Sequence, residues 1–219
     1  MPCKQPPHTV LNGSYCRLEP LQTDHAEGLY VANRLDADGR SWTYLPYGPF
    51  ASFSEYRQWV ESPWQKRNTQ LYAVIDLPSG KPVGIAGYLR PDPDNGAIEI
   101  GHLNFSPLLQ QTRAATEALY LLLAHVFAQG YRRCEWKCNA LNEPSRRAAL
   151  RLGFAYEGTF RQLLVVKGRN RDTAWFSIID GEWPALNGAL LQWLAAENFD
   201  AQGRQKLSLS SLTARLREA

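Results

Sequence analysis

Apolar and polar positions alternate through the middle of the chain in a pattern that predicts strands joined by tight turns. Residues 71–77 and 82–89 are mainly apolar, and Pro78-Ser79-Gly80-Lys81 between them is a typical turn sequence. Residues 91–96 contain two prolines, an asparagine and a glycine, and this second turn leads into 97–105. The pattern therefore predicts three consecutive strands in an antiparallel meander.

The segment after the meander has apolar residues at helical spacing. From about Arg113 to Gln129, apolar residues recur at intervals of three and four positions, and Gly130 is a natural C-cap. These apolar positions are Ala115, Leu119, Leu122, Leu123, Val126 and Phe127. The later elements expected are a strand at 134–139, a short helix at 145–152, strands at 154–166 and 173–179, and a helix at 184–196.

The N-terminal part of the chain predicts one strand followed by a helix. The strand ends near residues 18–21. Asp24 and Glu27 have the spacing of a capping box, which would open a helix that runs to about Asp36.

An aromatic segment and a second helix come next. The segment at 41–50 is rich in Trp, Tyr and Phe, and its prolines and glycine exclude regular structure. Ser52 and Glu55 form a second capping box, and the helix that they open should stop before or kink near Pro63. The overall order of elements is that of a mixed α/β protein with a largely antiparallel sheet, an order that more than one fold shares.

Length, net charge and cysteine content limit the classes of protein to which this chain can belong. The 219 residues favour one domain with a short appendage and suffice to bury a core without disulfides or metals. A net charge of +3 spread along the chain argues against nucleic acid as a partner but suits an anionic ligand. Four cysteines without a CxxC pair predict free thiols and no metal site.

The ends of the chain and its longest apolar stretch predict a cytoplasmic protein. Residues 1–10 are polar and lack the apolar core of a signal peptide. The stretch at 119–127 is interrupted by His125 and is too short to cross a membrane. The last twenty or so residues are polar and are expected to form a mobile tail.

Two segments carry candidate chemistry. Ile98 to Leu119 is a strand, a loop and the start of an apolar helix, and the N-terminus of a helix binds phosphate through unpaired backbone N–H groups. The alternative is an ordinary amphipathic helix with an alanine-rich packing face. In the second segment, Asn142 and Ser145 precede a short helix that ends at Gly153. Helix capping explains one of these two residues and leaves the other free.

These segments together resemble the GNAT superfamily of N-acyltransferases. Gln110-Gln111-Thr112-Arg113-Ala114-Ala115 is similar to the family's phosphate loop, Gln/Arg-x-x-Gly-x-Gly/Ala, with Arg113 in place of a glycine. Asn142-x-x-Ser145, followed by Gly153-Phe154 and Glu157-Gly158, resembles its second cofactor segment. Arg17 to Leu21, Arg171-Asp172 and Glu182-Trp183-Pro184 resemble the RimJ/RimL-like branch, which contains ribosomal-protein N-terminal acetyltransferases.

The resemblance implies a GNAT-type fold, with about seven strands in the sheet and helices on both faces. It covers residues 15–184, which we expect to form the acyltransferase domain, with an N-terminal extension at 1–14 and a C-terminal helix and polar tail at 185–219. It also implies acetyl-CoA as cosubstrate and direct transfer to a primary amine, in a monomer or homodimer. The acceptor is either a peptide or protein N-terminus or a small-molecule amine.

The resemblance also assigns roles to residues. Glu99 is the candidate base, His102 its alternative on the opposite face unless a bulge near Gly101 intervenes, and Ser145 the donor to the leaving thiolate. Expected cofactor contacts are Leu103, Asn104, Phe105, Gln110, Gln111, Thr112, Arg113, Ala114, Ala115, Thr116, Asn142 and Ser145. Expected acceptor contacts are Trp42, Tyr44, Tyr47 and His102.

Two alternatives stay open. The aromatic residues at 41–50 could instead form a satellite hydrophobic cluster under a long loop, and Trp175 is expected in the core. The chain as a whole could be a non-catalytic module that binds or senses CoA, because Arg113 departs from the glycine pattern.

Overall fold

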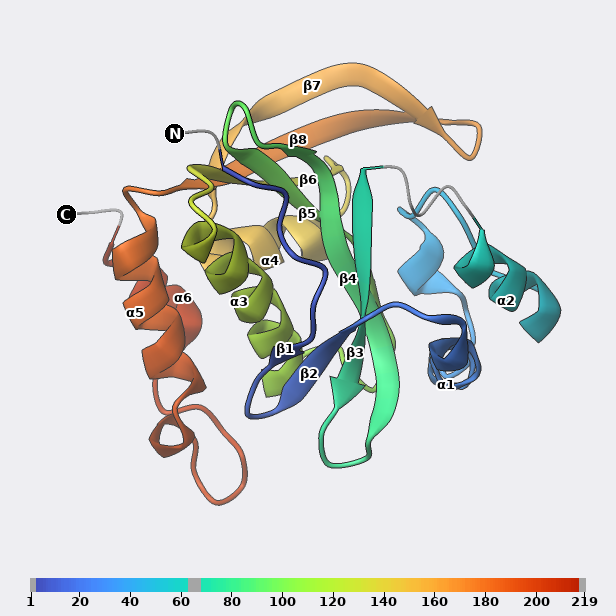
Figure 1. The fold of residues 1–219 in the computed structure, drawn as a ribbon, viewed down its shortest axis with the longest axis horizontal. Helices are drawn as coiled ribbons and strands as arrows, with labels where there is room; N and C mark the ends of the chain where they lie inside the picture. The colour runs from blue at the N-terminus through green and yellow to red at the C-terminus, as the bar shows by residue number, and fades with distance from the viewer. Residues whose placement is uncertain (1–2, 63–67, 217–219) are drawn as a thin grey trace.

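The computed structural model describes residues 3–62 and 68–216, and it has an eight-stranded sheet with helices on both faces (Figure 1). The strands are β1 (Leu11–Asn12), β2 (Cys16–Pro20), β3 (Thr69–Asp76), β4 (Lys81–Asp92), β5 (Ala97–Phe105), β6 (Arg133–Asn139), β7 (Ala155–Val166) and β8 (Arg169–Ile179). The α-helices are α1 (Ala26–Asn33), α2 (Phe53–Glu61), α3 (Arg113–Ala128), α4 (Glu143–Leu152), α5 (Trp183–Leu194) and α6 (Leu209–Ala214). The mixed α/β fold expected from the sequence is confirmed.

The strand order is β1-β2-β3-β4-β5-β6-β8-β7. Among the described strands, β5 and β6 are the one parallel pair, and every other neighbouring pair is antiparallel. The sheet has one strand more than expected, because the short β1 pairs with β2 through Leu11 and Leu18.

Alternating side chains on the strands bury two separate cores. Tyr72 and Val74 of β3 belong to the larger core, which includes residues of α3, α4, α5 and α6. Leu71 of β3 and Ile85 of β4 point the other way and pack with α1 and α2. The two helical layers lie on opposite sides of the strands in Figure 1. This two-sided burial explains the nearly continuous apolar sequence of β3 and β4.

The capping residues and the apolar spacing in the sequence predicted α2 and α3 correctly. The Thr112 hydroxyl caps α3 by accepting the N–H of Ala115 at 3.1 Å, and Ser52 caps α2 by accepting the N–H of Glu55 at 3.2 Å. Helix α2 ends at Glu61, as the sequence predicts, while Pro63 itself lies outside the described residues.

The predicted start and end of the first helix were wrong. A 3₁₀ turn at Thr23–His25 precedes α1, and the N–H of Gln22 is bound by Nδ1 of His25 at 3.1 Å. The cap therefore involves Gln22 and His25 instead of Asp24 and Glu27. Helix α1 ends at Asn33, and Asp36 instead accepts the N–H of Ser41 at 2.8 Å, which folds the chain into the next turn.

The expectation of a mobile polar tail was also wrong for most of its length. Leu209 and Leu212 of α6 are buried in the larger core, and α6 packs against α4 and α5. Phe199 and Gln205 form a bridge before it. Leu209 and Leu212 hold this segment against the core, although most of the other residues in it are polar. None of the helices within the described residues has the length and apolar character needed to cross a membrane.

Candidate active site

The parallel strands β5 and β6 pair over only part of their length. Their register runs from Ala97 with Arg133 to Ile100 with Trp136. Strand β5 nevertheless continues to Phe105, and β6 continues to Asn139. Beyond Ile100, the edge of β5 that faces β6 has no strand partner among the described residues, so its backbone N–H and C=O groups are available to a ligand.

A β-bulge reorients β5 at the same place. The β4–β5 register shifts between Ile85 and Gly87, and His102 adopts a left-handed conformation with φ of 51°. His102 contacts Tyr47, which packs against the smaller core. Ile98 and Ile100 belong to the larger core, so Glu99 between them points to the opposite face, where the smaller core lies. The bulge considered from the sequence is therefore present, and it brings Glu99 and His102 onto one face.

Asn104 lies just beyond the bulge and is completely buried. Both polar atoms of its amide lack a hydrogen-bond partner among the described residues. Buried amides in proteins are almost always paired. Because Asn104 is completely buried, the parts of β5 beyond the bulge that a ligand can reach belong to Leu103 and Phe105.

The loop before α3 turns its backbone toward the end of β5. The Gln110 side chain donates to the carbonyl of Phe105 at 2.7 Å, and Gln111 has a φ of 60°. The N–H groups of the first helical turn have no intrahelical partner, and the Thr112 hydroxyl takes up only that of Ala115. The remaining N–H groups of this turn, together with the small Ala114 and Ala115, fit a phosphate group.

The polar side chains of this loop are engaged with the protein itself. The Arg113 guanidinium lies 4.9 Å from the ring centre of Tyr15 and 4.4 Å from that of Phe199. The Thr116 hydroxyl is bound by Arg151 at 3.1 Å. The loop therefore offers a ligand its backbone more than its side chains.

Of Asn142 and Ser145, the structure shows that Asn142 is the helix cap and that the Ser145 side chain is not needed for capping. Asn142 caps α4, because its Oδ1 accepts the N–H of Ser145 at 3.2 Å. The Ser145 hydroxyl accepts the indole N–H of Trp136 at 3.0 Å. Burial raises the pKa of the neighbouring Cys138 thiol, and its hydrogen bond with Ser145 opposes that shift. Ser145 thus lies next to β6, near the point where β5 and β6 diverge.

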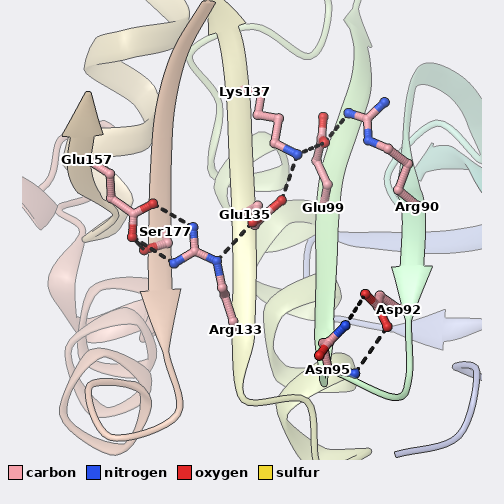
Figure 2. A network of polar contacts seen from close by, with 9 residues as sticks. All are labelled: Arg90, Asp92, Asn95, Glu99, Arg133, Glu135, Lys137, Glu157 and Ser177. Carbon is pink, nitrogen blue, oxygen red and sulfur yellow. Dashed lines mark hydrogen bonds and ion pairs between the residues drawn. The ribbon is translucent and has the colours of Figure 1, made fainter. Parts of the chain in front are cut away.

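Glu99 is buried in a network of charges that the sequence analysis missed (Figure 2). Its Oε2 contacts a guanidinium nitrogen of Arg90 and lies 3.0 Å from Nζ of Lys137. Lys137 also pairs with Glu135 at 2.7 Å. The residues come from the neighbouring strands β4, β5 and β6, so only the register brings them together.

The network continues across the sheet to β7 and β8 (Figure 2). Arg133 binds Glu135 at 2.9 Å and Glu157 at 2.5 Å, and Ser177 donates to Glu157 at 2.6 Å. The hydrogen bond from Arg133 is the main reason that the pKa of Glu157 falls to about 2. One signal was visible in the sequence, since Arg133, Glu135 and Lys137 alternate with buried residues along β6.

The aromatic segment at 41–50 lies on the same face of the sheet as Glu99 and His102. Trp42 is buried in the smaller core, so for this residue the hydrophobic-cluster interpretation holds. Tyr44 donates to the carbonyl of Leu141 at 3.0 Å, and Tyr47 hydrogen-bonds His102 at 3.0 Å. Lys167, at the tip of the β7–β8 hairpin, fastens the segment by donating to the Trp42 carbonyl at 2.9 Å. The expectation that Trp175 lies in the core was wrong: the residue is half-buried and flanks the charged network, with its ring centre 3.8 Å from Nζ of Lys137.

Comparison with known proteins identifies the family. The model of the acetyltransferase (GNAT) domain matches residues 16–155. A GCN5-related N-acetyltransferase from Brucella melitensis is 46% identical, with a TM-score of 0.94 and coverage of 97% of both chains. YdaF of Bacillus subtilis (strain 168), named as a candidate ribosomal N-acetyltransferase, is 25% identical over 169 residues, or 76% of this chain and 90% of YdaF.

A more distant structure shares the fold. RimL, a ribosomal L7/L12 α-N-protein acetyltransferase solved in complex with coenzyme A, is 20% identical, with a TM-score of 0.66. The match covers 78% of this chain and 97% of RimL. The chain therefore belongs to the GNAT acetyltransferase family, in the branch that resembles RimJ and RimL.

Proposed function

We propose that this enzyme transfers an acetyl group from acetyl-CoA to a primary amine by direct attack of the amine on the thioester. The observation that carries the proposal is the divergence of β5 and β6 beyond Ile100 and Trp136, with α3 starting shortly after β5 ends. An open strand edge can bind the amides of an extended arm, and the N-terminus of a helix can bind its phosphates.

Acetyl-CoA supplies an activated acyl group and a thiolate leaving group. The backbone N–H groups at 110–115 would bind its phosphates, because the side chains of Thr112, Arg113 and Thr116 are already engaged. The backbone of 103–105, on the unpaired edge of β5, would bind the pantetheine arm and the thioester oxygen. The RimL complex, which holds coenzyme A on the same fold, supports this cosubstrate.

The amine must lose its proton before it attacks, and we assign that step to Glu99. Arg90 and Lys137 bind the same carboxylate, so the site as a whole disfavours an ammonium ion and favours the neutral amine. His102 lies on the same face and would bind and position the acceptor together with Tyr47.

Ser145 would protonate or hydrogen-bond the departing thiolate. The Trp136 indole N–H occupies a lone pair of the hydroxyl oxygen, so the hydroxyl proton points away from Trp136. Asn142 fixes the position of Ser145 through the helix cap. The hydroxyl proton, which also reaches the Cys138 sulfur, would be shared with the sulfur of the departing thiolate.

The acceptor would lie between the aromatic segment and the charged network, against Tyr44 and Tyr47. YdaF's name supports a peptide or protein N-terminus, while the aromatic wall also suits a small-molecule amine. A non-catalytic module that binds CoA is the rival function. Arg113 favours that rival only weakly, because its backbone N–H is retained and its side chain packs on two rings.

Calorimetric titration with acetyl-CoA and with CoA, followed by a thiol-release assay over peptides and small amines, tests the proposal. We expect saturable binding at one site and amine-dependent release of thiol. Binding without release for any amine would favour the non-catalytic module. Absence of binding at millimolar acetyl-CoA would overturn the proposed function.

A further inference from the structure

Arg171 is a half-buried cation on β8 that has no counterion within the described part of the chain. Arg90, Arg133 and Lys137 each have a carboxylate within 4.0 Å, whereas no described carboxylate lies that close to Arg171. Its Nε is buried and has no hydrogen-bond partner there either. Burial is the main cause that lowers the pKa of Arg171, whereas the smaller effects of Cys138 and then of Glu99 oppose that shift.

Two more buried donors continue from Arg171 along the same strand. The Thr173 hydroxyl and the Trp175 indole N–H are buried, and neither has a partner among the described residues. Positions two apart on a strand share a face, so Arg171, Thr173 and Trp175 form one row, which we call the β8 donor row. Its far end touches the charged network, because Lys137 lies over the Trp175 ring.

We propose that the β8 donor row binds a carboxylate of the acceptor, so that the enzyme acetylates amines that carry a carboxylate close to the amino group. The inference rests on the proposed function, whose acceptor class it names. A carboxylate offers only acceptor atoms, and a guanidinium binds it through two parallel hydrogen bonds. Buried donors without acceptors are rare in folded proteins, and a carboxylate bound by the remaining N–H groups of Arg171, at one end of this row, would supply the counterion that its guanidinium lacks.

The charge of the site favours a monoanion. Four cations, Arg90, Arg133, Lys137 and Arg171, face three carboxylates, Glu99, Glu135 and Glu157, and one positive charge is left over. Glu99 and the β8 donor row also lie on the same face of the sheet, because their neighbours Ile100 and Ala174 both belong to the larger core on the other face. The acceptor is then an amino-acid unit that presents its amine and its carboxylate to the same face.

That unit has two possible sources. A free α-amino acid brings its own carboxylate, whereas a peptide brings one only when its first side chain is acidic. Matched acceptors separate them: an amino acid against its carboxamide, and peptide amides that begin with Asp against those that begin with Asn.

The test compares wild type with Arg171→Gln in the thiol-release assay on these matched pairs. We expect wild type to show a KM at least tenfold lower for the carboxylate member of one pair, and the pair concerned identifies the source. Arg171→Gln should remove this preference, so that the KM values of the carboxylate member and the neutral member become equal within about twofold. Arg171→Lys, which retains charge but not the two parallel donors, should restore part of the preference.

Arg169→Gln is the matched control, because Arg169 is an exposed arginine on the same strand and its loss changes the net charge equally. It should keep the preference. Equal KM values within both pairs for wild type, or a preference that survives Arg171→Gln, would overturn the inference while leaving acetyl transfer intact. If no amine releases thiol, titration of the same pairs onto the CoA-loaded protein still decides whether Arg171 selects the carboxylate.

Discussion

The Tyr47 hydroxyl lies 3.0 Å from Nδ1 of His102, and the two rings stack with their centres 5.4 Å apart. Burial is the main cause that lowers the pKa of His102 to about 4, and the positive charge of Arg90 contributes to the same shift. The imidazole is therefore neutral near pH 7.

This shift predicts a specific loss of stability in acid. The pKa of His102 is about 4 in the folded protein against an ordinary value of 6.5, so between these values the unfolded chain binds more protons. The free energy of unfolding should fall as pH decreases through this window, on the order of 3 kcal/mol from this residue. Urea unfolding at pH 7 and near pH 4.5 measures the loss.

His102→Asn isolates the contribution of this residue from those of other histidines. Asn tolerates the left-handed backbone that position 102 adopts. The variant should lose clearly less stability than wild type on acidification, and parallel pH dependences for the two proteins would contradict the assignment.

Glu117 is a buried carboxylate on α3 that supports the β1–β2 turn. It accepts the backbone N–H groups of Ser14, Tyr15 and Cys16 at 2.7, 2.6 and 2.8 Å. Glu117→Gln removes the charge and one acceptor, so we expect a loss of about 2 kcal/mol in the free energy of unfolding. Glu27→Gln, at an exposed site on α1, is the control and should change stability little. A Glu117→Gln protein as stable as wild type would show that these bonds contribute no net stability.

Ser145→Ala separates the leaving-group role from cofactor binding. The change removes the hydroxyl donor while Asn142 can still cap α4 through the backbone N–H of residue 145. We expect kcat to fall on the order of tenfold or more, with a smaller change in acetyl-CoA affinity.

Trp136→Phe is the companion variant for this prediction. It keeps the Ser145 hydroxyl and removes the indole N–H that orients it, so kcat should fall less than in Ser145→Ala. Equal losses of kcat and affinity in Ser145→Ala, measured by steady-state kinetics and calorimetry, would refute a role in the chemical step.

Arg113→Ala tests whether this side chain serves the phosphates or the fold. Its guanidinium lies between the rings of Tyr15 and Phe199, so its loss should free the segment at 199–206 and cost about 1 kcal/mol or more. Hydrogen exchange of that segment should quicken, while acetyl-CoA affinity changes less than threefold. Phe199→Leu should reproduce the faster exchange. A tenfold loss of affinity with unchanged exchange would instead assign the arginine to the phosphates.

Local sequence signals were sufficient for the elements around the cofactor loop. The bounds of α3 were predicted within one residue, because Thr112 and Gly130 mark its ends and its apolar spacing is regular. The cap before α1 was assigned to the wrong residues: Asp24 and Glu27 have the spacing of a capping box, but Gln22 and His25 form one, around the 3₁₀ turn that precedes the helix. Spacing alone does not reveal which of two overlapping candidates makes the bonds.

The candidate site was predictable only in part, for a reason that lies in the sheet. Residues on the loop and on α4 could be placed because they follow one another along the chain. Arg90 and Lys137 come together with Glu99 only through the register of β4, β5 and β6. Side-chain alternation alone would have put His102 and Glu99 on opposite faces, and the bulge after Gly101 reverses that arrangement.

The parallel pairing of β5 with β6 also has a consequence for how the protein unfolds. It joins two antiparallel groups of strands, β1–β5 and β6–β8, along a seam of four residue pairs whose partners are separated by the whole of α3. Such non-local pairing forms late and opens early relative to hairpins. A ligand held between β5 and β6 would bridge the two groups, so the amides at 97–100 and 133–136 should gain the most exchange protection when acetyl-CoA binds.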